Sequence, residues 1–167
     1  MNGFKNTTVW ILGALFTLVI ATWLFYRVSG QQQTYEQTDI SIDTGIVLFQ
    51  KKKYTEALAV FESIPPNSPG QWRALYYQGS AYIMLKDHQS AVVYLEQALA
   101  LNPGETQIMH ALGVAYFKLG NLKLSKAYFA TILETEPDNM EAKGLMDIMA
   151  NLERQQPKNA KPDPQGE

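Results

Sequence analysis

The stretch GETQIMHALGVAYFKLGNLKLSKAYFATILETEP, residues 104–137, decides the fold. It predicts two helices: Gly120 breaks the first, and Pro137 ends the second because a proline ring and its missing N–H oppose a further turn. The chain repeats this pattern upstream at an interval of 34 residues. Three columns share the interval, namely Gly45, Gly79 and Gly113; Pro69, Pro103 and Pro137; and Phe61, Leu95 and Phe129. Such an internal period predicts an all-α fold of stacked helix pairs.

Each column has a physical role in such a stack. The glycines let the first helix of a pair approach the second, where Ala57 and Ala91 offer a matching flat spot. The large residues of the third column are expected to fill the gap between neighbouring pairs. The three predicted pairs span residues 38–71, 72–105 and 106–139. Because the last pair would otherwise expose an apolar face, the amphipathic residues 140–154 are expected to form a capping helix.

The spacing of small, aromatic and proline residues over 38–139 resembles the tetratricopeptide repeat family. The fullest match comprises Leu112, Gly113, Tyr116, Gly120, Phe129 and Pro137. The chain departs from the family pattern at Lys52 and Lys86, which stand where the family has a turn glycine. The resemblance implies an α-solenoid whose first helices form a concave face that binds another protein.

The resemblance also implies which residues line that face. Carried over position by position, the groove comprises Phe49, Arg73, Tyr76, Tyr77, Ser80, Met84, His110, Val114, Phe117 and Lys118, with Ile42 and Ala111 on the same face. Some relatives grip a C-terminal carboxylate with groove asparagines, and Asp43, Tyr77 and Ala111 at those positions disfavour that mode. The apolar lining favours an amphipathic helix or an extended apolar peptide. Ordinary helix packing, or occupation by the chain's own C-terminal segment, is the alternative.

An uncharged segment precedes the repeats. Residues 6–26 hold 15 apolar side chains among 21, and about 20 helical residues cross a hydrocarbon core of roughly 30 Å. Residues 6–27 are therefore expected to form a transmembrane helix after a short tail, residues 1–5. Gly13, Thr17 and Ala21 give this helix a small-residue stripe for packing in the membrane. The alternative is a cleaved signal peptide, for which residues 28–30 offer small side chains.

The flanks of the expected span bear on its location. Lys5 and the α-amino group precede the span and Arg27 follows it, so a protein of a bacterial inner membrane is expected to have its repeats on the periplasmic side. The polar residues 28–37 are expected to form a linker. Residues 155–167, with three prolines and no large apolar side chain, are expected to be a disordered tail.

Composition excludes several classes of function. The chain has 167 residues, no cysteine and a net charge of −2, which argues against a thiolate metal site, a cysteine nucleophile and nucleic-acid binding. It holds only two histidines, His88 and His110, and no phosphate-binding loop or hydrolase motif. No metal, cofactor or enzymatic activity is expected. The run 51–53 of three lysines is either a solvated turn or a contact to anionic lipid headgroups.

Three functional hypotheses follow. The first is a non-enzymatic, membrane-anchored adaptor that binds a protein beside the bilayer during assembly of a membrane or exported complex. The second is a permanent accessory subunit of a membrane complex, held through the stripe of Gly13, Thr17 and Ala21. The third is a targeting receptor that faces the cytosol, which requires the opposite orientation. Membrane lipid is the expected second partner in each case.

Overall fold

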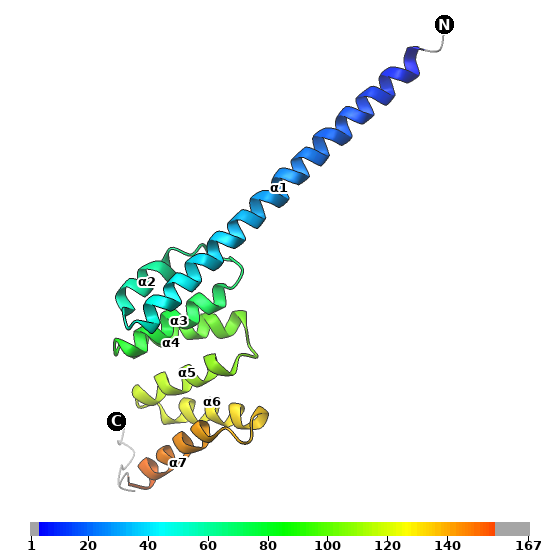
Figure 1. Cartoon of the computed structure of the whole chain (residues 1–167). Coiled ribbons are helices and arrows are strands. Elements are labelled where there is room, and N and C mark those ends of the chain that lie inside the picture. Colours follow the sequence, from blue (N-terminus) through cyan, green and yellow to red (C-terminus); the bar gives the residue numbers. More distant parts are fainter. Residues whose placement is uncertain (1–3, 156–167) are drawn as a thin grey trace, which may run out of the picture.

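The computed structural model describes the backbone of residues 4–155 and the side chains of residues 16–30 and 37–155. This part of the chain contains seven α-helices and no strand. They are α1 (Phe4–Gln50), α2 (Tyr54–Glu62), α3 (Gln71–Met84), α4 (His88–Leu101), α5 (Thr106–Lys118), α6 (Leu122–Thr135) and α7 (Met140–Gln155). Figure 1 shows α1 as a long rod whose C-terminal end joins a stack of shorter helices.

The stack is an α-solenoid, as the 34-residue period predicts. The C-terminal part of α1 packs against α2, α3 against α4, and α5 against α6, and α7 lies on α6 at the end of the stack (Figure 1). Helix α7 contributes Ala142 and Met149 to a buried cluster around Phe129. It therefore covers the apolar face of the last pair, where a capping helix is expected.

The glycine column explains how closely the paired helices approach. A Cβ on Gly79 would lie 2.5 Å from Leu95 Cγ, and one on Gly113 would lie 2.7 Å from Phe129 Cζ. Gly45 has the same relation to Phe61. The third-column side chains thus press on the glycine of their own pair, a contact that the sequence analysis did not predict. They also reach the next pair, since the rings of Phe61 and Tyr77 stack at 5.9 Å.

The turn between the two helices of each pair has one backbone conformation. Lys52, Lys86 and Gly120 occupy equivalent positions and have φ angles of 61°, 65° and 77°. This left-handed conformation is easy for glycine and costs other residues about 1–2 kcal/mol. The two lysines therefore occupy a backbone position that suits glycine better.

Residues 28–37, expected to form a linker, are instead helical and continuous with both neighbouring segments. They include no proline, and Gly30 lowers helix stability by only about 1 kcal/mol. Helix α1 therefore runs for 47 residues, about 70 Å at 1.5 Å per residue. A helix, rather than an extended chain, separates the stack from the N-terminal part of α1.

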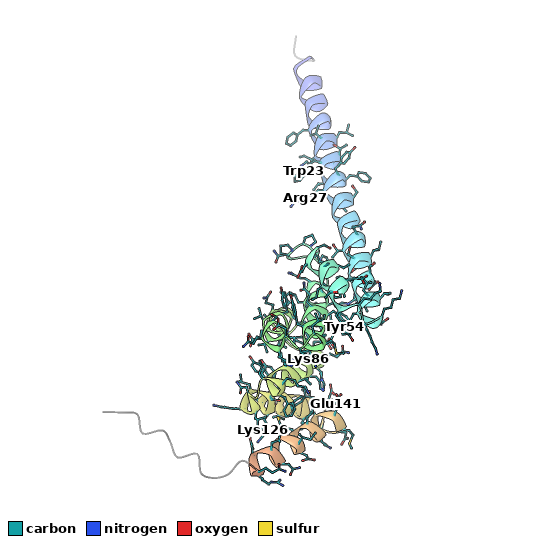
Figure 2. The ribbon with its side chains drawn as sticks, turned by 90° about the vertical axis from the view of Figure 1, so that its left-hand side faces the viewer. Trp23, Arg27, Tyr54, Lys86, Lys126 and Glu141 are labelled. Carbon is teal, nitrogen blue, oxygen red and sulfur yellow. The ribbon has the colours of Figure 1, made fainter. Side chains whose placement is uncertain are left out.

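The N-terminal part of α1 projects from the stack, and Trp23 and Arg27 lie on this projection in Figure 2. Its described apolar side chains are exposed, among them Phe16, Val19, Trp23 and Phe25. Among the described residues, no helix has a stretch that is long and apolar enough to span a membrane. The side chains of residues 6–15, which make up the first part of the expected span, lie outside those described, as do residues 156–167 of the expected tail.

Candidate functional site

The predicted groove lies on the first helices of the three pairs. Successive first helices contact each other, α1 with α3 and α3 with α5, and so form the inner face of the stack. Helix α1 contributes Phe49, α3 contributes five of the predicted residues, and α5 contributes the remaining four. We call these ten residues the groove.

An aromatic cluster occupies the part of the groove between α1 and α3. The ring centroid of Tyr77 lies 5.5 Å from that of Phe49 and 5.0 Å from that of Tyr76. Tyr77 also stacks on Phe61, and Phe49 contacts Tyr54 at 5.4 Å. The side chains of Phe49, Tyr54, Tyr76 and Tyr77 are half-buried, and that of Phe61 is buried. Tyr77 therefore belongs both to the groove and to the core of the first pair, whereas Tyr76 lies further along the inner face.

The α5 part of the groove is also partly core. Val114 and Phe117 pack against the buried cluster around Phe129, and the Lys118 ammonium lies 5.9 Å from the Phe117 ring centroid. Met84, at the end of α3, is the most exposed apolar residue of the groove, with an exposed fraction of 52%. Val114 and Phe117 therefore contribute to helix packing, whereas Met84 is available at the surface of the groove.

Two residues expected on the concave face are not accessible there. Ile42 is fully buried in the core of the first pair, and Ala111 is buried between α4 and α5. Ile42 belongs to a buried cluster with Phe61 and Ala74, and Ala111 belongs to one that also holds Leu75 of α3. Neither can contact a partner.

The predicted cation Arg73 is already paired. Its Nη2 donates to Asp43 Oδ1 at 3.2 Å, which joins α3 to α1. Because the carboxylate balances the guanidinium charge, Arg73 offers a bound segment less positive charge than the sequence alone suggests. Lys118, at the far end of α5, is exposed.

Tyr76 and His110 lie together at a cavity of about 450 Å³. Its wall also includes Glu105, Thr106, Gln107, Glu136, Asn139 and Glu141, from the start of α5, the end of α6 and the start of α7. His110 Nε2 lies 3.1 Å from Glu141 Oε1, and the imidazole ring packs edge-on to Phe129. The wall of this cavity thus joins the predicted groove residues Tyr76 and His110 to the ends of α6 and α7.

Two ionisable groups of the cavity are perturbed. Hydrogen bonds from the side chains of Asn139 and Thr106 lower the pKa of Glu136, which favours the charged form of this carboxylate. Burial raises the pKa of Tyr76, which stays neutral. The cavity therefore presents anionic oxygens beside a neutral phenol ring.

Sequence reasoning missed the carboxylates of this cavity. Glu105, Glu136 and Glu141 belong to helix ends and connections, and no groove position of the family falls on them. They come together only because α7 stacks on the last pair. Glu105 lies two residues after Pro103, and Glu136 directly precedes Pro137, so the prolines that end the second helices mark these two positions in the sequence.

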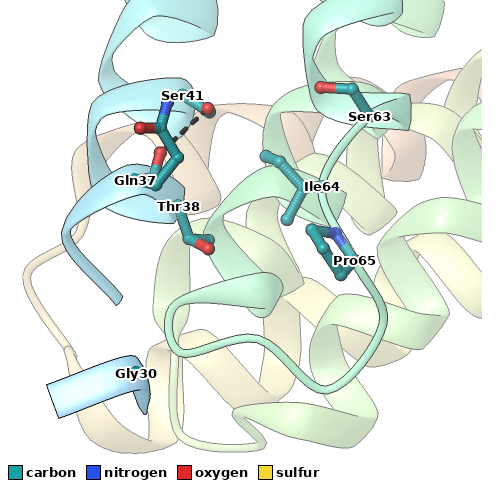
Figure 3. A pocket seen from close by; sticks show the side chains of 7 residues that line it. All are labelled: Gly30, Gln37, Thr38, Ser41, Ser63, Ile64 and Pro65. Atoms are coloured by element: carbon teal, nitrogen blue, oxygen red, sulfur yellow. Dashed lines mark hydrogen bonds between the residues drawn. The ribbon is translucent and has the colours of Figure 1, made fainter. Parts of the chain in front are cut away.

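A second cavity, of about 430 Å³, lies between α1 and the connection from α2 to α3. Figure 3 shows its wall: Gln37, Thr38 and Ser41 from α1 face Ser63, Ile64 and Pro65, with Gly30 further along α1. The Ser41 hydroxyl donates to the Gln37 carbonyl at 2.9 Å and so is satisfied within the helix. Within the described residues, no group of three His, Asp or Glu side chains is placed to hold a metal ion.

The residues of the expected membrane stripe lie apart from both cavities. Thr17 and Ala21 are exposed on the projecting part of α1, and Gly13 lies outside the residues whose side chains are described. They touch no part of the groove. Any role of this stripe is thus independent of the inner face.

Comparison with known proteins agrees with this geometry. Residues 82–149 match the tetratricopeptide repeat family model. No curated protein matches the chain significantly.

Three solved tetratricopeptide domains illustrate the similarity of fold. The first domain of Spaghetti (RPAP3), bound to the HSP90 peptide SRMEEVD, is 26% identical, with a TM-score of 0.68 over 72% of this chain and 95% of that one. The first domain of human RPAP3 is 26% identical, with a TM-score of 0.65 over 70% and 92%. The Arabidopsis OM64 domain is 18% identical, with a TM-score of 0.67 over 71% and 98%. Residues 82–149 thus match the tetratricopeptide repeat family, and the α-solenoid of this chain is similar to the fold of these solved domains.

Proposed function

We propose that this protein is a non-enzymatic adaptor that binds a peptide segment of another protein in the groove, and that α1 anchors it in a bacterial inner membrane. The observation that carries the binding role is the cavity on the inner face, where Tyr76 and His110 meet. A peptide segment can insert a side chain there while its neighbours lie along the half-buried rings of α3. The role in assembly of a membrane or exported complex extends this proposal.

The relatives support a peptide as the ligand. The Spaghetti domain, which is 26% identical and matched over 95% of its length, holds an HSP90 peptide. The present groove has the same kind of scaffold, helix pairs whose first helices line one face. Aromatic side chains such as Tyr76 suit this role, because a rigid ring offers a large contact area at little cost in conformational entropy.

The anchoring role rests on the N-terminal part of α1. Residues 6–26 have no charged side chain, and the exposed apolar residues 16–26 surround the helix rather than forming one face. At the end of this run the Arg27 guanidinium lies 5.3 Å from the Trp23 ring centroid. A cation and an indole at one level are typical of a helix that reaches a membrane–water interface.

Photo-crosslinking tests the binding role. A photoreactive amino acid replaces Met84 in the groove or, as a matched control, Val93 on α4; both side chains have an exposed fraction of 52%. After irradiation of whole cells, adducts are expected from position 84 and not from position 93. Adducts from both positions alike, or from position 93 alone, would show that the groove is not the binding surface.

Fractionation tests the anchor and its orientation. The full chain should stay in the membrane pellet after carbonate extraction, and a chain that begins at residue 28 should be released. Protease added to spheroplasts should cleave the repeats if they are periplasmic. Cleavage only after lysis would contradict the periplasmic location, and release of the full chain by carbonate would contradict the anchor.

A further inference from the structure

The cavity beside Tyr76 carries unbalanced negative charge. Its wall includes Glu105, Glu136 and Glu141, and no lysine or arginine among the described residues lines it. The ion pairs of the described chain place no lysine or arginine on any of these three carboxylates. Glu136 accepts a hydrogen bond from Asn139, which is neutral and so leaves the negative charge in place.

The His110 imidazole lies beside one of these carboxylates in the cavity wall. Its Nε2 lies 3.1 Å from Glu141 Oε1 but makes no well-aligned hydrogen bond in the structure. The Glu141 carboxylate is largely exposed on its other side, so it can accept from a second donor. The cavity therefore favours a cation that brings several N–H donors.

The surface that leads into the cavity is aromatic. Tyr76 forms part of the wall and contacts Tyr77, which in turn contacts Phe49. A lysine or arginine side chain that enters beside Tyr76 can rest its methylene groups, or its cationic group, on the face of the ring. Arg73 is paired with Asp43 and does not oppose such a cation strongly.

We propose that the groove selects a partner segment in which apolar side chains adjoin a lysine or arginine, with the cationic group in the cavity of Glu105, Glu136 and Glu141. This inference rests on the proposed peptide-binding function and adds the charge of the ligand. The expected preference is opposite to the acidic character of the HSP90 peptide SRMEEVD, which the Spaghetti domain holds. Charge complementarity is the observation that favours a basic segment.

Fluorescence anisotropy with defined peptides tests the preference. The full chain in detergent micelles is titrated into labelled acetyl-ALFALAAKAKA-amide, into its counterpart with glutamate at both lysine positions, and into SRMEEVD. The lysine peptide should bind at least tenfold more tightly than either acidic peptide. Its affinity should also fall as the salt concentration rises, because the contact is electrostatic.

Two double variants that remove the same charge test whether the cavity causes the preference for the lysine peptide. Glu105→Gln with Glu136→Gln should reduce the affinity for the lysine peptide about tenfold and remove most of the discrimination. The control, Glu134→Gln with Asp147→Asn, removes the same formal charge from exposed positions outside the cavity and should leave the affinity within about twofold. Equal losses in the two double variants would overturn the assignment to the cavity.

The outcomes separate this inference from the function on which it rests. If the glutamate peptide binds as tightly as the lysine peptide, the basic preference is wrong and peptide binding stands. If neither peptide binds, the inference is overturned, and crosslinking at Met84 decides the proposed function independently. If removal of residues 156–167, which carry Lys158 and Lys161, raises the affinity more than tenfold, the occupant is this segment and not a partner.

Discussion

The ring of Phe129 occupies the space where a Cβ on Gly113 would lie, with Cζ 2.7 Å from that position. The same relation joins Gly79 to Leu95, so the approach of the two helices in a pair depends on a missing side chain. The 34-residue period thus has a direct physical basis in packing.

Gly113→Ala should lower the free energy of unfolding by about 1–2 kcal/mol, because displacement of the rigid Phe129 ring outweighs the higher helix propensity of alanine. Urea denaturation followed by circular dichroism measures the change. Gly144→Ala is the matched control: a Cβ at this position on α7 meets open space, and the substitution should raise stability by about 0.5–1 kcal/mol. Equal effects at the two positions would show that Phe129 does not determine the helix approach.

Lys86→Gly should stabilise the protein by about 0.5–1 kcal/mol, since glycine adopts the left-handed φ of 65° without the strain of a side chain. Gly120→Ala at the equivalent turn should destabilise it by a similar amount. Thermal denaturation of the pair of variants checks the sign of each change. If the melting temperatures of Lys86→Gly and Gly120→Ala shift in the same direction, the two turns do not share one backbone conformation.

The Tyr116 hydroxyl donates to Glu96 Oε1 at 2.6 Å, which joins the second pair to the third. A double-mutant cycle of Tyr116→Phe and Glu96→Gln should give a coupling free energy of about 1 kcal/mol. If the losses of stability in the two single variants simply add up in the double variant, the hydrogen bond contributes nothing to the junction between the pairs.

The same contact predicts a dependence on alkaline pH. Burial and the bond to Glu96 raise the pKa of Tyr116, and burial raises those of Tyr82 and Tyr128. Because the folded pKa values lie above the unfolded value of about 10, the stabilisation is complete below about pH 10 and is lost as pH rises further. The urea midpoint of the parent protein should fall above pH 10. The midpoint of the Tyr116→Phe variant should fall less steeply over the same pH range. If the urea midpoints of the two proteins fall in parallel with pH, ionisation of Tyr116 is not the cause of the loss of stability.

Continuity of α1 predicts one well-defined distance along the helix. The backbones of the exposed residues Val28 and Val47 should lie about 28 Å apart, because the helix rises about 1.5 Å for each of the 19 residue steps between them. Spin labels are attached at these two positions. Double electron–electron resonance on the full chain should give a single narrow distribution. A broad or much shorter distribution would show that residues 28–37 act as an unstructured linker.

Sequence could predict the features that depend on a residue's intrinsic properties. A glycine column marks close helix approach and a proline column marks helix ends, so the pairing of α3 with α4 and of α5 with α6 follows from single positions. The helical state of residues 28–37 did not follow, because polar residues without proline suit a helix and a linker alike. Their continuity depends on the helices that flank them.

The site was predictable only in outline. The family pattern puts Tyr76, Ile42 and Ala111 on one face, whereas in the structure Tyr76 lines a cavity and the other two are buried. The cavity carboxylates of Glu105 and Glu136 come from separate connections, and only the stacking of α7 brings them into one wall. No local pattern encodes such a juxtaposition.

The central claim is that the inner face of the first helices binds a peptide segment, and amide chemical-shift mapping tests it most directly. The isotope-labelled full chain in micelles is titrated with the lysine peptide described above. The largest shifts should occur at the amides of Tyr76, Glu105 and His110, with little change at Val93 on α4. Largest shifts at Val93 and its neighbours on the second helices, or no shifts at the inner face at saturating peptide, would contradict the claim.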